Sequence, residues 1–116
     1  MDFSFSPEEQ ELQKRVRQLA QEQIAPIAAE AGESNRVSPE LMRILAQADL
    51  LRYCVPQEHG GYGIKAVLLC IIREELAQVS AQADSNFILQ GLGSYPITLG
   101  GTPEQKARYL PPHRQE

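Results

Sequence analysis

The chain has 116 residues and a net charge of −4, with no basic cluster interleaved with aromatic residues, which argues against nucleic acid as a partner. Apolar content of 42% and charged content of 22% are ordinary for a globular protein, and the length suits one domain with one core. The N-terminus, MDFSFSPEEQ, lacks the basic and apolar regions of a signal peptide. We therefore expect a single domain, residues 1–116, in the cytoplasm.

The two cysteines, Cys54 and Cys70, have neither CxxC spacing nor a neighbouring histidine. Two isolated thiols without a secretory signal are typical of a reducing compartment. Cys70 stands in a strongly apolar segment, where a free cysteine behaves as a small hydrophobe. We interpret both as core residues and expect no metal site.

The first predicted helix begins at Ser6, which is a natural N-cap, with Pro7 at the first helical position and Glu9 completing a capping box. Apolar residues then recur at helical spacing. Pro26 either ends this helix near Ile24 or is tolerated with a bend. The apolar stripe consists of Leu12, Val16, Leu19, Ile24, Ile27 and Ala31.

A polar loop is expected over residues 32–37, followed by a second start signal in Ser38 and Pro39. The amphipathic helix that follows has its apolar residues at i, i+3, i+4, i+7 and i+10. These positions are Leu41, Ile44, Leu45, Ala48 and Leu51.

Leu51–Val55 is predicted as a short extended piece, because the residue before a proline favours extended geometry. Pro56–Gly63 contains three glycines and is predicted as a compact turn with positive φ. A phosphate-binding loop is the alternative. The spacing matches neither GxGxxG nor the Walker pattern, which favours the turn.

The segment from Lys65 to Gly101 is the most apolar part of the chain and predicts a helix hairpin. Its first helix, about Lys65 to Ser80, is apolar on nearly every face and is expected to be buried on all sides. Its second helix starts near Gln82–Asp84 and runs towards Tyr95. No charged residue occurs from Ser85 to Pro103, but the glycines and polar residues there argue against a membrane span.

Two glycines in the second helix, Gly91 and Gly93, each cost about 1 kcal/mol of helix stability relative to alanine, and mark close approach by another backbone or a ligand. Thr102, Pro103 and Gln105 form a third start signal. A short helix to Leu110 follows. Two prolines are expected to stop it, leaving residues 111–116 as a polar tail where a next domain would start. The fold class is therefore all-α, an up-and-down bundle of about five helices.

In this order, FSFSPEEQELQKRVRQLAQEQIAP, VPQEHGGYGI, REELAQVSA and PITLGGTPEQKARYLP resemble the N-terminal helical domain of acyl-CoA dehydrogenases. The resemblance extends from Phe3 to Pro111 and depends on a combination of residues rather than on any one of them. The residues that carry it are Pro56, Gly60, Gly61, Gly63, Glu75, Leu76, Ala77, Pro96, Ile97, Gly100, Glu104, Gln105, Lys106, Tyr109, Leu110 and Pro111.

This resemblance implies a flavoenzyme of three domains that binds FAD and removes two hydrogens from the α and β carbons of an acyl-CoA thioester. A carboxylate takes the α-proton, flavin N5 takes the β-hydride, and electrons pass to an electron-transfer flavoprotein. The flavin segments and the catalytic glutamate of the family belong to domains beyond this chain. Glu74, Glu75 and Asp84 fall in stretches that do not carry the base. We therefore assign no catalytic residue, leave the cofactor-binding residues unknown, and expect the isolated chain to be colourless and inactive.

One local role can be transferred from the family, whose fourth helix forms a wall of the acyl pocket. For Ile88 and Leu92, packing in the bundle core is an equal alternative. Asp84 is unusual in an apolar pocket, and is either a cap or a sign of a polar or short acyl substrate. The matching residues, our predicted substrate-binding set, are Asp84, Ser85, Ile88, Leu89 and Leu92.

Two other functions remain open at this point. One is a sibling flavoenzyme of the same fold, an acyl-CoA oxidase or a flavin-dependent monooxygenase. The other is a free-standing helical module that binds a partner and does no chemistry. A domain separated from its neighbours would expose an apolar docking face, so self-association or a homo-oligomer is also expected.

Overall fold

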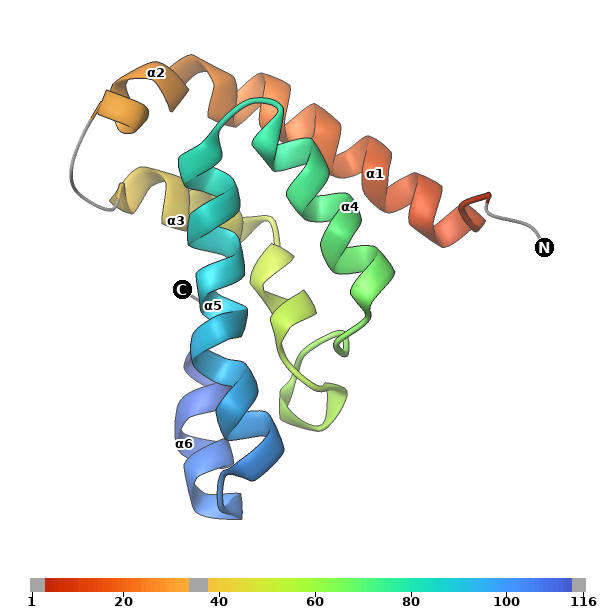
Figure 1. The fold of residues 1–116 in the computed structure, drawn as a ribbon, viewed down its shortest axis with the longest axis vertical. Coiled ribbons are helices and arrows are strands. Elements are labelled where there is room, and N and C mark those ends of the chain that lie inside the picture. The colour runs from red at the N-terminus through yellow and green to blue at the C-terminus, as the bar shows by residue number, and fades with distance from the viewer. Residues whose placement is uncertain (1–3, 34–37, 114–116) are drawn as a thin grey trace.

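The computed structural model describes residues 4–33 and 38–113, which form five helices and no strand (Figure 1). The predicted all-α class is therefore confirmed. The domain is a flat layer measuring 43 × 40 × 20 Å. A helix with its side chains is about 10–12 Å across, so the layer is less than two helices deep at its thinnest.

The first helix is continuous from Pro7 to Glu33 and comprises α1 (Pro7–Leu19), a π-helical turn (Ala20–Ile24) and α2 (Ala25–Glu33). The predicted capping box is confirmed: Glu9 N–H donates to Ser6 Oγ at 3.2 Å, and Ser6 N–H donates to Glu9 Oε1 at 2.7 Å.

The π-helical turn explains how the first helix passes Pro26. A proline removes one backbone donor and clashes with the carbonyl four residues earlier. Immediately before it, the Ala25 N–H donates to Ala20 C=O, five residues back. The widened turn lets the helix continue to Glu33, two residues into the predicted loop. Residues 34–37 of that loop lie outside the described residues.

The helix α3 (Pro39–Gln47) starts as predicted, with Ser38 Oγ accepting from Leu41 N–H. It ends at Gln47, and Asp49, two residues further on, has a left-handed φ of 61°. The predicted extended piece is wrong: Leu50–Cys54 forms a 3-10 helix, η2. A turn of three residues places Leu51 and Cys54 on the same side, and both are buried. Only Val55, next to the proline, is extended there.

The glycine-rich turn is confirmed and contains a short 3-10 segment, η3 (Gln57–His59). Gly60 and Gly63 have φ of 89° and 93°, conformations that favour glycine. Gly61 is required for space instead. A Cβ built there lies 1.9 Å from the Val55 carbonyl oxygen.

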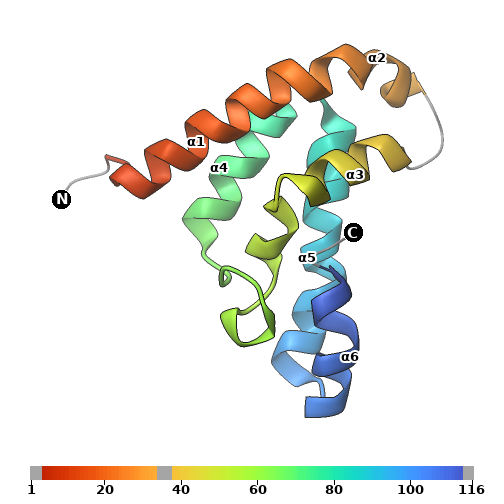
Figure 2. The same ribbon diagram turned by 180° about the vertical axis from the view of Figure 1, so that it is seen from behind.

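The predicted hairpin consists of α4 (Ala66–Ala77) and α5 (Ala81–Gly100), side by side in both views (Figures 1 and 2). The expectation that α4 is buried on all sides is wrong, because Cys70 is exposed and Val67 is 49% exposed. The helix packs against α1 and α5, and its remaining face lies at the surface of the layer. Cys54 is buried as expected, but the interpretation of Cys70 as a core residue is wrong.

The second helix of the hairpin is longer than predicted. It begins at Ser80, whose Oγ accepts from Ala83 N–H, and it continues past Pro96 to Gly100. Pro96 has no N–H to donate to the Leu92 carbonyl, so the helix lacks one backbone hydrogen bond there. Thr98 Oγ donates to Ser94 C=O and adds a contact in the same turn.

The last helix, α6 (Pro103–His113), lies along α5 (Figure 1). Its predicted capping box is confirmed: Thr102 and Gln105 exchange bonds of 2.9 and 3.2 Å. The prediction that it stops after Leu110 is wrong, because the helix runs through both prolines to His113. Neither proline has an N–H to donate, so the last turn is held by fewer backbone hydrogen bonds.

A partly buried ion pair joins α1 to α4. Arg17 donates from its Nε to Glu75 Oε2 at 3.1 Å and from a terminal nitrogen to Glu75 Oε1 at 2.9 Å. Gln13 Nε2 donates to Glu75 Oε1 at 3.3 Å. The Glu75 side chain is 2% exposed and that of Arg17 is 53% exposed, so the carboxylate is inside and the guanidinium reaches it from the surface.

The core lies where these helices converge. Of the apolar stripe predicted for the first helix, Leu12, Val16 and Ile24 belong to it, and Leu19 and Ile27 pack against it. In the part of the chain that the structure describes, none of the helices has the length and apolar character needed to cross a bilayer. The buried apolar cluster consists of Leu12, Val16, Ile24, Leu41, Ile44, Leu45, Leu50, Leu51, Cys54, Leu68, Ile71, Ile72, Leu76, Ala83 and Phe87.

Candidate functional site

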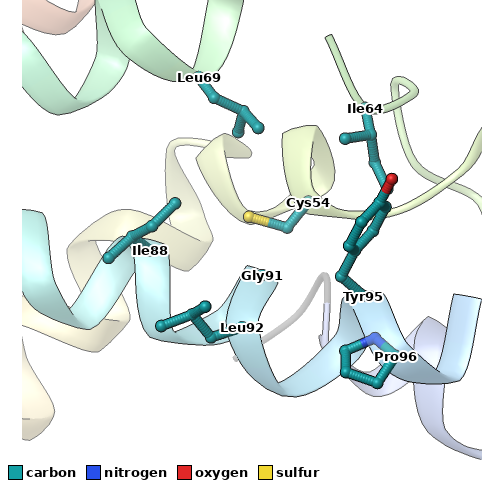
Figure 3. A pocket seen from close by; sticks show the side chains of 8 residues that line it. All are labelled: Cys54, Ile64, Leu69, Ile88, Gly91, Leu92, Tyr95 and Pro96. Carbon is teal, nitrogen blue, oxygen red and sulfur yellow. The ribbon is translucent and has the colours of Figure 1, made fainter. Parts of the chain in front are cut away.

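An apolar pocket lies between the middle of α5, the 3-10 helix η2, α4 and the end of the glycine turn (Figure 3). Its volume is about 320 Å³. Four different segments contribute to it, so it exists only in the folded chain. The lining residues are Cys54, Ile64, Leu69, Ile88, Gly91, Leu92, Tyr95 and Pro96.

Contacts between η2 and α5 fix the back of the pocket. The Ser94 hydroxyl donates to Cys54 C=O at 3.4 Å, and the Cys54 thiol points to Phe87 C=O at 4.0 Å. Gly91 faces the same cysteine, and a Cβ built there lies 3.6 Å from Cys54 Sγ. One of the two glycines predicted to mark a close approach therefore lies against a side chain of η2.

The pocket is suited to an apolar group, because its only polar side-chain atoms belong to Cys54 and Tyr95. Burial raises the pKa of the Cys54 thiol from 9.0 to about 11, a rise that the Gly91 backbone partly offsets. The thiol is therefore neutral at physiological pH and reacts slowly there, because the thiolate is the nucleophile. The pocket can bind and shield an aliphatic group, but its lining holds no charged side chain.

Ionisation of Cys54 is expected to make the folded chain less stable in alkali. The unfolded thiol ionises near pH 9, whereas the folded thiol keeps its proton to about pH 11. The stabilisation is fully present below pH 9 and is lost as the pH rises through 11. Between these values the free energy of unfolding should fall by roughly 2 kcal/mol more in the parent than in Cys54→Ala. Urea denaturation at each pH measures this, with Cys70→Ala as the exposed-thiol control. Equal slopes in all three proteins would contradict it.

The structure brings two of the five predicted substrate-binding residues together in this pocket, Ile88 and Leu92. Leu89 is 54% exposed and Ser85 is exposed, and neither lines the pocket. The Asp84 carboxylate instead accepts from Arg73, at 2.8 and 3.3 Å, across the hairpin. This ion pair gives Asp84 a structural role within the domain.

Sequence reasoning missed six lining residues: Cys54, Ile64, Leu69, Gly91, Tyr95 and Pro96. Three of them lie on α5 at helical spacing from Ile88 and Leu92: Gly91 and Tyr95 fall within the predicted helix, and Pro96 follows directly after it. The glycine at position 91 was noticed as a possible point of close approach. The other three come from segments whose position against α5 is set by tertiary packing.

FAD does not fit the described residues by themselves. Flavin rings are held through hydrogen bonds to their nitrogens, and pyrophosphates through helix N-termini and glycine-rich loops after a strand. The pocket offers only a thiol and a phenol, and the glycine turn follows the extended Val55 and a 3-10 segment. Among the described residues there is also no group of three His, Cys, Asp or Glu side chains that could hold a metal ion.

The sequence matches the family described as "Acyl-CoA dehydrogenase, N-terminal domain" over residues 6–115. The chain therefore belongs to the acyl-CoA dehydrogenase family, as its N-terminal helical domain. The resemblance seen in the sequence motifs is thereby confirmed.

Relatives and solved structures agree with this assignment. The chain is 35% identical over 109 residues to the probable acyl-CoA dehydrogenase FadE25 of Mycobacterium tuberculosis, covering 94% of this chain and 28% of that protein. A chain of the electron transferring flavoprotein structure of Acidaminococcus fermentans superposes with a TM-score of 0.85 and 26% identity, over 99% of this chain and 30% of that one. A nitroalkane oxidase shares the fold at a TM-score of 0.84 and 24% identity, over 98% and 28% of the two chains. The chain thus spans less than a third of these proteins.

Proposed function

We propose that this domain is the N-terminal part of an FAD-dependent acyl-CoA dehydrogenase and that it forms one wall of the pocket for the acyl group. The observation that carries the proposal is the apolar pocket on α5, in a chain that belongs to this family. Two residues assigned to that wall from the sequence, Ile88 and Leu92, line it.

The physical role of the wall is to remove the acyl tail from water. Each methylene buried against such a surface contributes about 0.8 kcal/mol. Ile88, Leu69 and Leu92 offer branched aliphatic side chains from two helices, and the partly exposed Leu92 and Tyr95 leave the pocket open on one side. The proposed role of these residues is to bind and orient the tail. The acid–base and redox steps are assigned to no residue of this chain.

The isolated chain is expected to be colourless and inactive on acyl-CoA, because its described residues do not fit FAD. The purified chain is incubated with FAD and desalted, and its absorption spectrum is then recorded from roughly 300 to 600 nm, where roughly one bound flavin per chain would count as binding. A second measurement is an acyl-CoA dehydrogenation assay. Flavin retained at one equivalent, or turnover, would overturn this expectation.

The acyl-wall role can be tested with a protein that carries this domain together with the flavin-binding and base-bearing parts of the family enzyme. Leu92→Gln is expected to raise the KM for a medium-chain acyl-CoA about tenfold with little change in kcat, because it removes apolar contact. Leu89→Gln is the matched comparison, on the same helix but outside the pocket. A larger effect at position 89 than at 92 would contradict the assignment of the pocket, while no acyl-CoA turnover by the parent would sink the proposed function.

The remaining substrate-binding predictions, Asp84 and Ser85, are tested with the same protein. If Asp84→Ala leaves the preference between short and long acyl groups unchanged, its carboxylate serves only the ion pair with Arg73. Acyl-CoA is the proposed substrate and an electron-transfer flavoprotein the proposed electron acceptor. A cytoplasmic location and a place in fatty acid metabolism are part of the same proposal, supported by the two free thiols and by the family.

The α5 surface supports a further part of the proposal, contact with other protein surfaces. Leu89, Leu92, Tyr95 and Leu99 recur at helical spacing and are 46 to 69% exposed. Such a stripe favours docking of other domains, and self-association of the chain when it is alone. A monodisperse monomer in light scattering, without dye binding, would instead favour a free-standing module. A sibling oxidase or monooxygenase remains the second candidate, since a nitroalkane oxidase has the same fold.

A further inference from the structure

Two small residues form the floor of the apolar pocket. Cys54 projects from η2 into the middle of the pocket wall, and Gly91 lies opposite it on α5 (Figure 3). The 3.6 Å between Cys54 Sγ and a Cβ built at Gly91 is an ordinary van der Waals contact. An alanine at position 91 would therefore fit without strain, whereas any larger side chain would extend into the cavity.

The walls around this floor are made of large side chains. Leu69 and Ile88 stand on one side of Cys54, and Ile64 and Tyr95 on the other (Figure 3). Cys54 itself is 3% exposed, so it is reached only through the cavity. A protein cavity of about 150 Å³ is large enough to bind benzene. The volume of this pocket, about 320 Å³, exceeds that. Because the two floor residues are small and the wall residues are bulky, the pocket is wide at its floor as well as long.

We propose that Cys54 and Gly91 are the residues that determine acyl-group size in this site, and that they admit an aliphatic group as wide as a six-membered ring or a branched chain. This inference rests on the proposed function for the identity of the ligand as an acyl group. The shape of the floor itself can be tested without any acyl-CoA.

The test uses the thiol of Cys54 as an attachment point. In a Cys70→Ser background, which removes the exposed thiol, the chain is treated at about pH 9, where a small fraction of Cys54 is thiolate, with methyl methanethiosulfonate or with cyclohexylmethyl methanethiosulfonate. The Cys54 thiolate attacks the sulfur that bears the alkyl group, a mixed disulfide forms, and methanesulfinate leaves. Intact mass gives the labelling rate. Both reagents are expected to label the folded chain, and the cyclohexylmethyl adduct should keep the helical circular dichroism, with a Tm no more than about 5 °C below that of the methyl adduct.

Gly91→Val narrows the floor and should lower the rate of cyclohexylmethyl labelling at least tenfold while changing methyl labelling less than about threefold, because pocket discrimination for a methylene or two is of that order. Gly93→Val is the matched control, since Gly93 is on the same helix, is exposed and does not line the pocket. An adduct that unfolds the parent, or equal cyclohexylmethyl rates in the parent and Gly91→Val, overturns the proposal. If Gly91→Val does not fold, Gly91→Ala is used instead. Its rate of cyclohexylmethyl labelling should be about threefold lower than that of the parent, and an unchanged rate overturns the proposal.

The substrate class is tested in the protein that also carries the flavin and base. There, Gly91→Val should lower the ratio of kcat/KM for cyclohexanecarbonyl-CoA to that for butyryl-CoA about tenfold, and Gly93→Val should leave the ratio unchanged. An equal loss for both substrates overturns the assignment of size selectivity. A parent that turns over neither substrate overturns the proposed function, while the labelling result still decides the shape of the floor.

Discussion

Gly61→Ala is expected to lower the free energy of unfolding by about 3 kcal/mol. The added Cβ would lie 1.9 Å from the Val55 carbonyl oxygen and 2.5 Å from its carbon, and both are backbone atoms that no side-chain rotation can move. To make room, the turn would have to open. It would then lose bonds such as Gly63 N–H to Val55 C=O, now 3.0 Å.

Urea denaturation followed by circular dichroism measures the effect. Gly100→Ala is the matched control, because a Cβ there meets nothing within 4 Å and the position is helical. It should gain up to about 1 kcal/mol. Equal stabilities of the two variants would show that the turn can rearrange at no cost. Since Ile64 follows this turn and lines the pocket, the same substitution should also alter labelling of Cys54.

Arg17→Met is expected to destabilise the domain considerably more than Glu75→Met, although the two residues form one ion pair. Removing Arg17 leaves the Glu75 carboxylate buried with Gln13 as its remaining hydrogen-bond donor. Removing Glu75 leaves an arginine that is already half exposed and can turn to water. Glu75→Met therefore leaves no buried charge unpaired, and we expect it to cost about 1 kcal/mol or less, as for an exposed pair.

The double variant Arg17→Met with Glu75→Met is expected to recover most of the stability lost in Arg17→Met. A double-mutant cycle from urea denaturation then gives a coupling that is strongly non-additive, as in a contact shielded from water. If the two single variants are equally unstable and their effects add, the pair behaves as an exposed salt bridge and does not hold α1 to α4.

Local signals predicted three helix starts correctly, whereas α5, expected to start near Gln82–Asp84, begins at Ala81 after the cap Ser80. Ser6 with Glu9, Ser38 with Pro39, and Thr102 with Gln105 are each contained within four residues, and the bonds that they form depend on nothing further away. Helix interiors were less predictable. The widened turn before Pro26 and the passage of α5 through Pro96 both depend on packing that outweighs the loss of one hydrogen bond.

The burial of α4 and the contents of the pocket show the limit of sequence periodicity. An apolar helix face can pack against a neighbour or remain exposed, and the pattern of Val67, Leu68 and Cys70 is the same in both cases. Likewise, the spacing of Ile88 and Leu92 along α5 predicted that they lie on the same face of the helix. It contained no information on η2, whose Cys54 faces them only because the chain between α3 and α4 folds back.

The thinness of the domain determines how much of α5 its own neighbours can cover. In a layer 20 Å thick, a cylinder of about 10–12 Å cannot be surrounded, and part of its circumference must face outwards. The helix is nevertheless uncharged from Ser85 onward, and its outward arc carries leucines and a tyrosine. The composition of α5 is therefore that of a helix buried on all sides. The layer is too thin to bury it on all sides, so part of its apolar surface stays exposed.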